Sequence, residues 1–98
     1  MDIAAFQQVI ADTFAARDRA RGLSASVAWL CEEVGELAKA ARKGSVDEQR
    51  EELADVLAWL SSIAEQLGVS LEDAAVTRYG SGCPKCGATP CACPLGRG

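Results

Sequence analysis

Two acidic pairs are the residues of this sequence whose types and spacing could do chemistry. Glu33 with Glu36, and Glu52 with Asp55, are each spaced i, i+3, which places both side chains of a pair on the same side of a helix. Gly44 is the midpoint between Glu36 and Glu52, and equally between Glu33 and Asp55. If the chain folds back at Gly44, we expect these carboxylates to converge along one groove.

Clustered carboxylates repel one another unless cations lie between them. Oxygen ligands select hard ions such as magnesium, which takes a few carboxylates together with waters and phosphate oxygens of a substrate. The sequence contains no histidine, which excludes imidazole metal sites, histidine bases and the Glu-x-x-His pattern of di-iron bundles. The acidic pairs therefore predict a site for one or more Mg²⁺ ions, which would receive a polyphosphate and lower the pKa of a coordinated water.

A solvated helix face is the competing interpretation, because single E-x-x-E pairs arise by chance in many helical proteins. Glu32, Glu48 and Glu51 are assigned to that interpretation, with Glu48 as a helix cap. Two pairs that stand in register, each with a tryptophan nearby, favour a functional site.

Three side chains beside the acidic pairs are candidates for substrate binding. Trp29 lies on the stripe of the first acidic pair and Trp59 on the stripe of the second, so their flat faces could stack a base. A core or interface position remains an equal alternative for Trp29. Lys43 continues the side of the first pair and could reach a phosphate, although cations at helix ends are also explained by the helix dipole.

Helices must position these residues, since apolar residues recur with helical period and strand-like alternation is absent. Glycines at the ends of Ala-rich segments mark the turns. The pattern predicts helices over residues 2–21, 24–43 and 46–67 and a short fourth helix that ends near Tyr79. We therefore expect an all-α antiparallel bundle of about four helices. A core this small is expected to be completed by a homodimer or a dimer of dimers.

The chain changes character at Gly80, which divides it into a predicted helical catalytic domain at 1–79 and a tail at 80–98 rich in Gly, Pro and Cys. Cys83 and Cys86 form a C-x-x-C pair and Cys91 and Cys93 a C-x-C pair. These thiolates could complete a closed, tetrahedral, structural Zn²⁺ site. Redox-active or simply reduced thiols are the alternative. The fifth cysteine, Cys31, stands in an apolar stretch and is predicted to be a core residue.

Charge and hydropathy limit the partners and the compartment. The 10 basic and 14 acidic residues give a net charge of −4, which disfavours nucleic acid as a partner because nucleic-acid binders carry a basic face. No apolar run approaches the ~20 residues that span a bilayer, and the first residues lack the pattern of a signal peptide. A cytoplasmic protein without a membrane partner is expected.

The sequence around the acidic pairs resembles the MazG-type all-α nucleotide pyrophosphohydrolases. Their E-x-x-E and E-x-x-D signature is similar to Glu33-Val34-Gly35-Glu36 followed by Glu52-Leu53-Ala54-Asp55, within WLCEEVGELAKAARKG and EELADVLAWLSSIAEQLGVSLEDA. The opening FQQVIADTFAARDRARG is also similar, so the resemblance extends over roughly residues 3–80.

This resemblance implies a magnesium-dependent enzyme that hydrolyses nucleoside triphosphates to monophosphates and pyrophosphate. It implies that a metal-activated water attacks the α-phosphate. Glu33, Glu36 and Asp55 would be direct ligands, and Glu52 would be a ligand or would orient and deprotonate the water. Glu36 and Glu52 are therefore the expected catalytic residues, and Trp59 matches a position where related enzymes place an aromatic side chain near the base. The alternative function is a non-catalytic helical dimer whose zinc knuckle contacts protein or nucleic acid.

Overall fold

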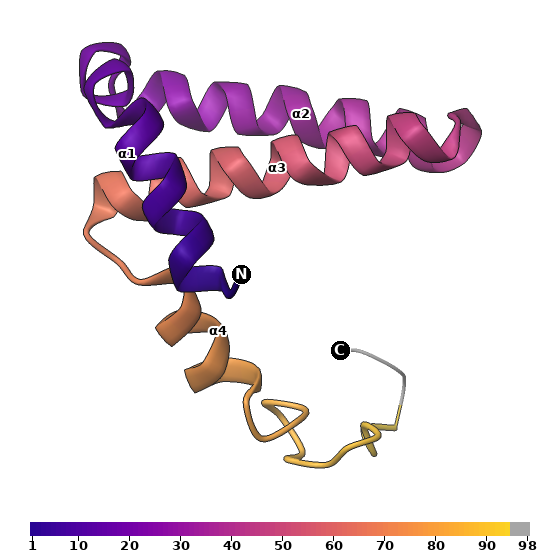
Figure 1. Cartoon of the computed structure of the whole chain (residues 1–98). Coiled ribbons are helices and arrows are strands. Elements are labelled where there is room, and N and C mark those ends of the chain that lie inside the picture. Colours follow the sequence, from indigo (N-terminus) through magenta and orange to yellow (C-terminus); the bar gives the residue numbers. More distant parts are fainter. Residues whose placement is uncertain (95–98) are drawn as a thin grey trace.

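The computed structural model describes residues 1–94 and places four helices in them (Figure 1). Residues 95–98 of the expected tail lie outside the described residues. The helices are α1 at Ile3–Arg21, α2 at Leu23–Lys43, α3 at Val46–Leu67 and α4 at Leu71–Tyr79. No strand occurs within the described part of the chain, so the all-α prediction is confirmed and the helix bounds differ from the expected ones by a residue at most.

Helices α2 and α3 form the long antiparallel hairpin that the acidic pairs require (Figure 1). Ser45 caps α3 by accepting from the Glu48 backbone N–H at 3.1 Å, and the Glu48 side chain accepts from the Ser45 N–H at 3.2 Å. This reciprocal capping box satisfies donors that the first turn of a helix leaves unpaired. Gln49 then donates to the carbonyl oxygens of Ala40 and Gly44, at 3.0 and 3.3 Å. Local hydrogen bonds therefore hold the turn at Gly44.

Helix α1 crosses one end of the hairpin, and α4 continues below it (Figure 1). Buried Gln7 joins the elements: its side-chain nitrogen donates to Glu65 and to the Val69 carbonyl, both at 2.9 Å, while its oxygen accepts from the Leu71 N–H at 2.8 Å. Each polar atom of this buried amide thus has a partner, which a buried polar group requires. Gln7 therefore fixes α1 against the segment that connects α3 to α4.

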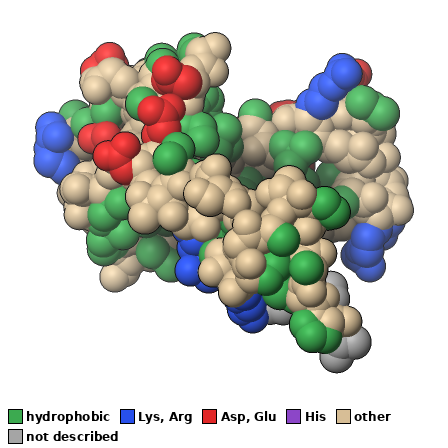
Figure 2. Space-filling view, turned by 90° about the horizontal axis from the view of Figure 1, so that it is seen from below, with side chains coloured by type: hydrophobic (Ala, Val, Ile, Leu, Met, Phe, Trp, Pro, Cys, Tyr) green, Lys and Arg blue, Asp and Glu red, His purple; other side chains and the backbone are tan. Residues whose placement is uncertain are grey.

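The apolar core of a single chain is thin. Among the described residues, only Ile10, Ala40 and Ala64 are buried apolar side chains. Apolar side chains also lie open on the face shown in Figure 2. On α2, Val27 and Val34 are 43% and 46% exposed, and Cys31 between them is exposed as well. The prediction that Cys31 is a core residue is therefore wrong for this chain, because its side of α2 is left uncovered.

Within residues 1–94, no helix combines the length and the apolar character needed to cross a bilayer.

Candidate functional site

The fold-back at Gly44 brings acidic side chains of α2 and α3 together. Glu33 from α2 and Glu52 and Asp55 from α3 each offer a carboxylate oxygen, and these oxygens all lie within 4.8 Å of one another. All three side chains are half-buried. Glu33, Glu52 and Asp55 are called the carboxylate cluster below.

Glu36, the fourth acid of the expected set, lies outside this cluster. The sequence paired Glu36 with Glu52 and Glu33 with Asp55, whereas the structure groups Glu33 with both acids of α3. Three residues on a helix turn by about 300°, so Glu36 is rotated by about 60° from Glu33. Its side chain is consequently exposed, although its charge still contributes to raising the pKa of Glu52.

Glu52 has the most perturbed environment of the cluster. Its pKa is raised from 4.5 to about 6, first by desolvation, then by a hydrogen bond to Glu33, and then by the negative charges of Glu33, Asp55 and Glu36. Its Oε2 is shielded from solvent and has no hydrogen-bond partner among the described residues. A buried carboxylate oxygen without a partner is costly unless a cation or donor compensates it.

The donor set fits a hard divalent cation. Three converging carboxylates from two helices supply only oxygen, and magnesium is bound through a small number of carboxylates while keeping other positions for water and phosphate. A cation would compensate both the mutual repulsion of these acids and the unpartnered oxygen of Glu52. The cluster therefore fits magnesium on its own chemistry.

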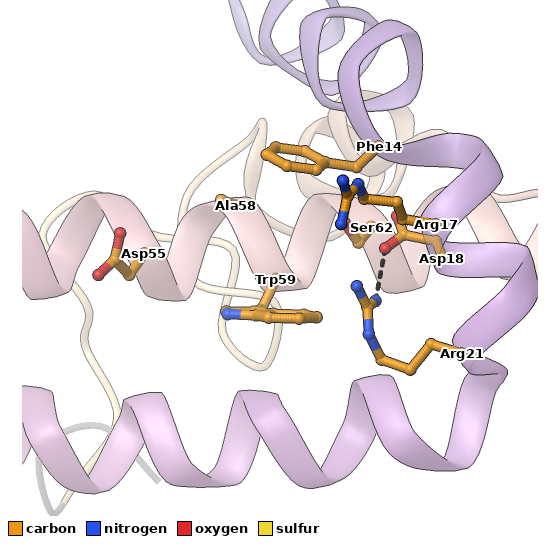
Figure 3. A pocket seen from close by; sticks show the side chains of 8 residues that line it. All are labelled: Phe14, Arg17, Asp18, Arg21, Asp55, Ala58, Trp59 and Ser62. Atoms are coloured by element: carbon orange, nitrogen blue, oxygen red, sulfur yellow. Dashed lines mark hydrogen bonds and ion pairs between the residues drawn. The ribbon is translucent and has the colours of Figure 1, made fainter.

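A cavity of about 340 Å³ opens beside the cluster, between α1 and α3 (Figure 3). Its lining combines aromatic, cationic and acidic side chains and consists of Phe14, Arg17, Asp18, Arg21, Asp55, Ala58, Trp59 and Ser62. Asp55 belongs to this lining and to the carboxylate cluster. The carboxylate cluster and the aromatic cavity are therefore adjacent, and they share the Asp55 side chain.

Trp59 is held in place by two neighbours. Its ring stacks on Trp29 with centroids 5.9 Å apart and planes 7° from parallel. The Arg21 guanidinium lies 4.8 Å from the Trp59 ring centroid, within cation–π range. Arg21 is itself fixed by an ion pair of 2.6 Å to buried Asp18 (Figure 3). Trp29 thus supports Trp59 and is not part of the cavity lining.

Three cavity residues, Phe14, Arg17 and Arg21, were not expected as site residues from the sequence. Arginines near the C-terminal end of a helix are accounted for by the helix dipole, but the spacing of 14, 17 and 21 also places these residues on one helix face. Which neighbour that face meets depends on how α1 crosses the hairpin. Lys43, by contrast, lies ten residues beyond Glu33 on α2, about 15 Å along the axis. It is exposed and does not line the cavity.

A second cluster of metal-ligating side chains lies in the tail. The sulfur atoms of Cys83, Cys86, Cys91 and Cys93 all lie within 4.8 Å of one another. Backbone N–H groups of Cys86 and Lys85 lower the pKa of the Cys83 thiol to about 6. Hydrogen bonds among the crowded sulfurs, led by the one to Cys91, raise the pKa of Cys93 to about 11.

The fold is all-helical, and the site combines an acidic cluster with an aromatic cavity that share Asp55. The family model of the MazG nucleotide pyrophosphohydrolase domain matches residues 21–86, about two thirds of the chain. This chain belongs to the MazG family, and membership indicates a hydrolase that acts on nucleotides. A search of curated proteins found no match. The matched range includes every acid of the two pairs, whereas most of α1 precedes it.

Proposed function

We propose that this chain hydrolyses nucleoside triphosphates to nucleoside monophosphates and pyrophosphate with the help of Mg²⁺. One observation supports the proposal most directly: Asp55 belongs to the carboxylate cluster and also lines the aromatic cavity. A nucleotide has a flat base and a polyphosphate with a short sugar between them. The adjacent cavity and cluster match these two ends.

The base is assigned to the cavity. Phe14 and Trp59 lie on opposite sides of the opening in Figure 3, with Arg17 and Arg21 toward α1. Stacking on an aromatic side chain contributes about 1–3 kcal/mol per base. Arg17 offers guanidinium N–H groups to the nucleotide, while Arg21 keeps the Trp59 ring in position.

The phosphates are assigned to the acidic end of the site. Glu33, Glu52 and Asp55 converge and would hold Mg²⁺, and the exposed Glu36 would join them from the next turn of α2. When bound, the ion would neutralise phosphate charge and lower the pKa of water. Glu52 would orient the attacking water and accept its proton, since its pKa of about 6 is close to that of a general base at neutral pH. The water oxygen joins the α-phosphorus, the bond from that phosphorus to the bridging oxygen breaks, and pyrophosphate leaves.

Homo-oligomerisation belongs to the same proposal. Val27, Cys31 and Val34 form an exposed apolar stripe on α2, and only three apolar side chains are buried within the described part of one chain. A second copy could cover this stripe and complete the core.

Hydrolysis in ¹⁸O-labelled water tests the reaction. The purified chain is incubated with a panel of nucleoside and deoxynucleoside triphosphates, with and without Mg²⁺. We expect release of pyrophosphate only with Mg²⁺, with the label in the monophosphate, since water attacks the α-phosphorus. Release of orthophosphate, or label in the pyrophosphate, would contradict the proposed reaction.

A further inference from the structure

The tail lacks an apolar core that could hold it together. None of the described residues from 80 to 94 is buried, and α4, which precedes them, also buries no side chain. The segment nevertheless makes a series of tight turns instead of running extended (Figure 1). Ordering a backbone costs about 1–2 kcal/mol per residue, so an interaction other than apolar burial must compensate for that cost.

The first cysteine pair lies in a closed turn. The Gly87 N–H donates to the Cys83 carbonyl at 2.7 Å, and the Cys83 N–H donates to the Ala88 carbonyl at 3.1 Å. Gly87 has a φ of +73°, a backbone conformation that glycine adopts without strain. Gly82 approaches the far arm of the tail closely, since a Cβ there would collide with Thr89 Oγ1.

Backbone N–H groups of residues 92 and 93 point at one sulfur atom of each cysteine pair. The Ala92 N–H donates to Cys86 Sγ at 3.3 Å, and the Cys93 N–H donates to Cys91 Sγ at 3.4 Å. N–H donors stabilise sulfur in its charged form. The N–H donor on Cys86 therefore favours the thiolate of that residue, the form that binds metals.

The four sulfur atoms converge from the two arms. Cys83 Sγ lies 3.7 Å from Cys93 Sγ, and all four sulfurs lie within 4.8 Å of one another. The four cysteines are free thiols. Four converging thiolates without a cation would repel one another, and such a set suits a tetrahedral ion that prefers sulfur.

We propose that Cys83, Cys86, Cys91 and Cys93 bind one Zn²⁺ ion in a closed structural site that holds the tail in this fold. The site is distinct from the carboxylate cluster, because soft thiolates select zinc whereas the oxygen cluster selects magnesium. With every ligand position filled by protein sulfur, the ion has no open position for substrate. Its contribution is to order residues 83–93 after α4.

Metal analysis of the full-length chain tests the proposal. We expect about one zinc per chain in the wild type, and loss of zinc in Cys86→Ser and in Cys93→Ser. Two controls should retain zinc: Cys31→Ser, which removes the cysteine outside the tail, and Glu33→Gln, which alters the oxygen cluster. Iron in place of zinc, a zinc-free wild type or loss of zinc in Glu33→Gln would each overturn the proposal.

Cobalt substitution provides a second readout in case a serine variant fails to fold. Wild-type protein loaded with Co²⁺ should show the intense thiolate-to-cobalt charge-transfer absorption of a four-sulfur site, and added Zn²⁺ should abolish it. A spectrum without thiolate bands, or a Cys83–Cys93 disulfide in freshly reduced protein, would refute the site. These readouts do not depend on nucleotide hydrolysis, so the zinc site and the proposed enzymatic activity can fail separately.

Discussion

Glu52 is the acid whose surroundings at the site oppose its ionisation most strongly. It is half-buried and faces the charges of Glu33, Asp55 and Glu36. The pKa of Glu52 is therefore raised to about 6 from 4.5. Protonation of this one carboxyl decides how well the cluster can bind a cation.

The first prediction concerns pH. Folding favours protonated Glu52, so in the metal-free protein its contribution to stability is fully present below pH 4.5 and is lost as the pH rises through about 6. Mg²⁺ binds the ionised form and compensates this loss. We expect Mg²⁺ to raise the melting temperature more above pH 6 than below pH 4.5, measured by thermal denaturation at matched ionic strength.

Glu52→Gln is the control for the pH prediction. Glutamine keeps the shape of the side chain but does not ionise in this range. The variant should lose most of the pH dependence of the Mg²⁺ effect. An equal Mg²⁺ effect at both pH values in the wild type would show that the cluster does not bind the ion through Glu52.

At the scale of the element, α1 supplies the part of the site that the sequence did not reveal. Arg17 lines the cavity whereas Arg19, on the same helix, does not. We expect Arg17→Ala to raise the KM for the nucleotide about tenfold, consistent with a loss of about 1.4 kcal/mol of binding. Arg19→Ala should leave the KM unchanged. Steady-state kinetics of both variants measure the difference, and equal KM values would remove Arg17 from the site.

The hairpin turn provides a prediction about stability. Ser45→Ala removes the side-chain oxygen that accepts from the Glu48 N–H, and loss of such a cap costs about 1 kcal/mol. Ser24, which is exposed near the start of α2, makes no hydrogen bond through its side chain within the described residues. Urea denaturation should show Ser45→Ala less stable than Ser24→Ala. A similar midpoint for both would mean that the capping box does not stabilise the turn.

Local signals made the helices predictable. The Ser45–Glu48 capping box marks the start of α3, and Gly44 marks the end of α2. Both helix ends depend on hydrogen bonds between residues that are close in the sequence. The same turn made the meeting of Glu33, Glu52 and Asp55 predictable to within one helical turn.

The rotation of α2 about its axis and the point at which α1 crosses α3 were not predictable from local sequence signals. The exposure of Glu36 depends on how far α2 is rotated about its axis, and the expected register did not include that rotation. The placement of Arg17 and Arg21 beside Trp59 depends on where α1 crosses α3, which buried Gln7 and Asp18 help to fix. Both are tertiary properties that spacing along one helix does not encode.

At the scale of the whole molecule, the open stripe of α2 predicts assembly. Val34 is 46% exposed on this stripe. Val34→Glu would place a charge in the contact between copies, so we expect a shift toward the monomer in light scattering coupled to size-exclusion chromatography. Val46→Glu, at the hairpin turn and away from the stripe, is the matched control. A wild type that is monomeric at all concentrations would contradict the assembly.

The most direct test of the central claim compares acids inside the carboxylate cluster with acids just beside it. Glu33→Gln and Asp55→Asn each remove one charge from the cluster, while Glu32→Gln and Glu51→Gln remove one charge from exposed neighbours. We expect Mg²⁺-dependent pyrophosphate release to fall by at least about 100-fold in the first two variants and to stay near the wild-type rate in the others. Equal rates in all four variants would contradict the account.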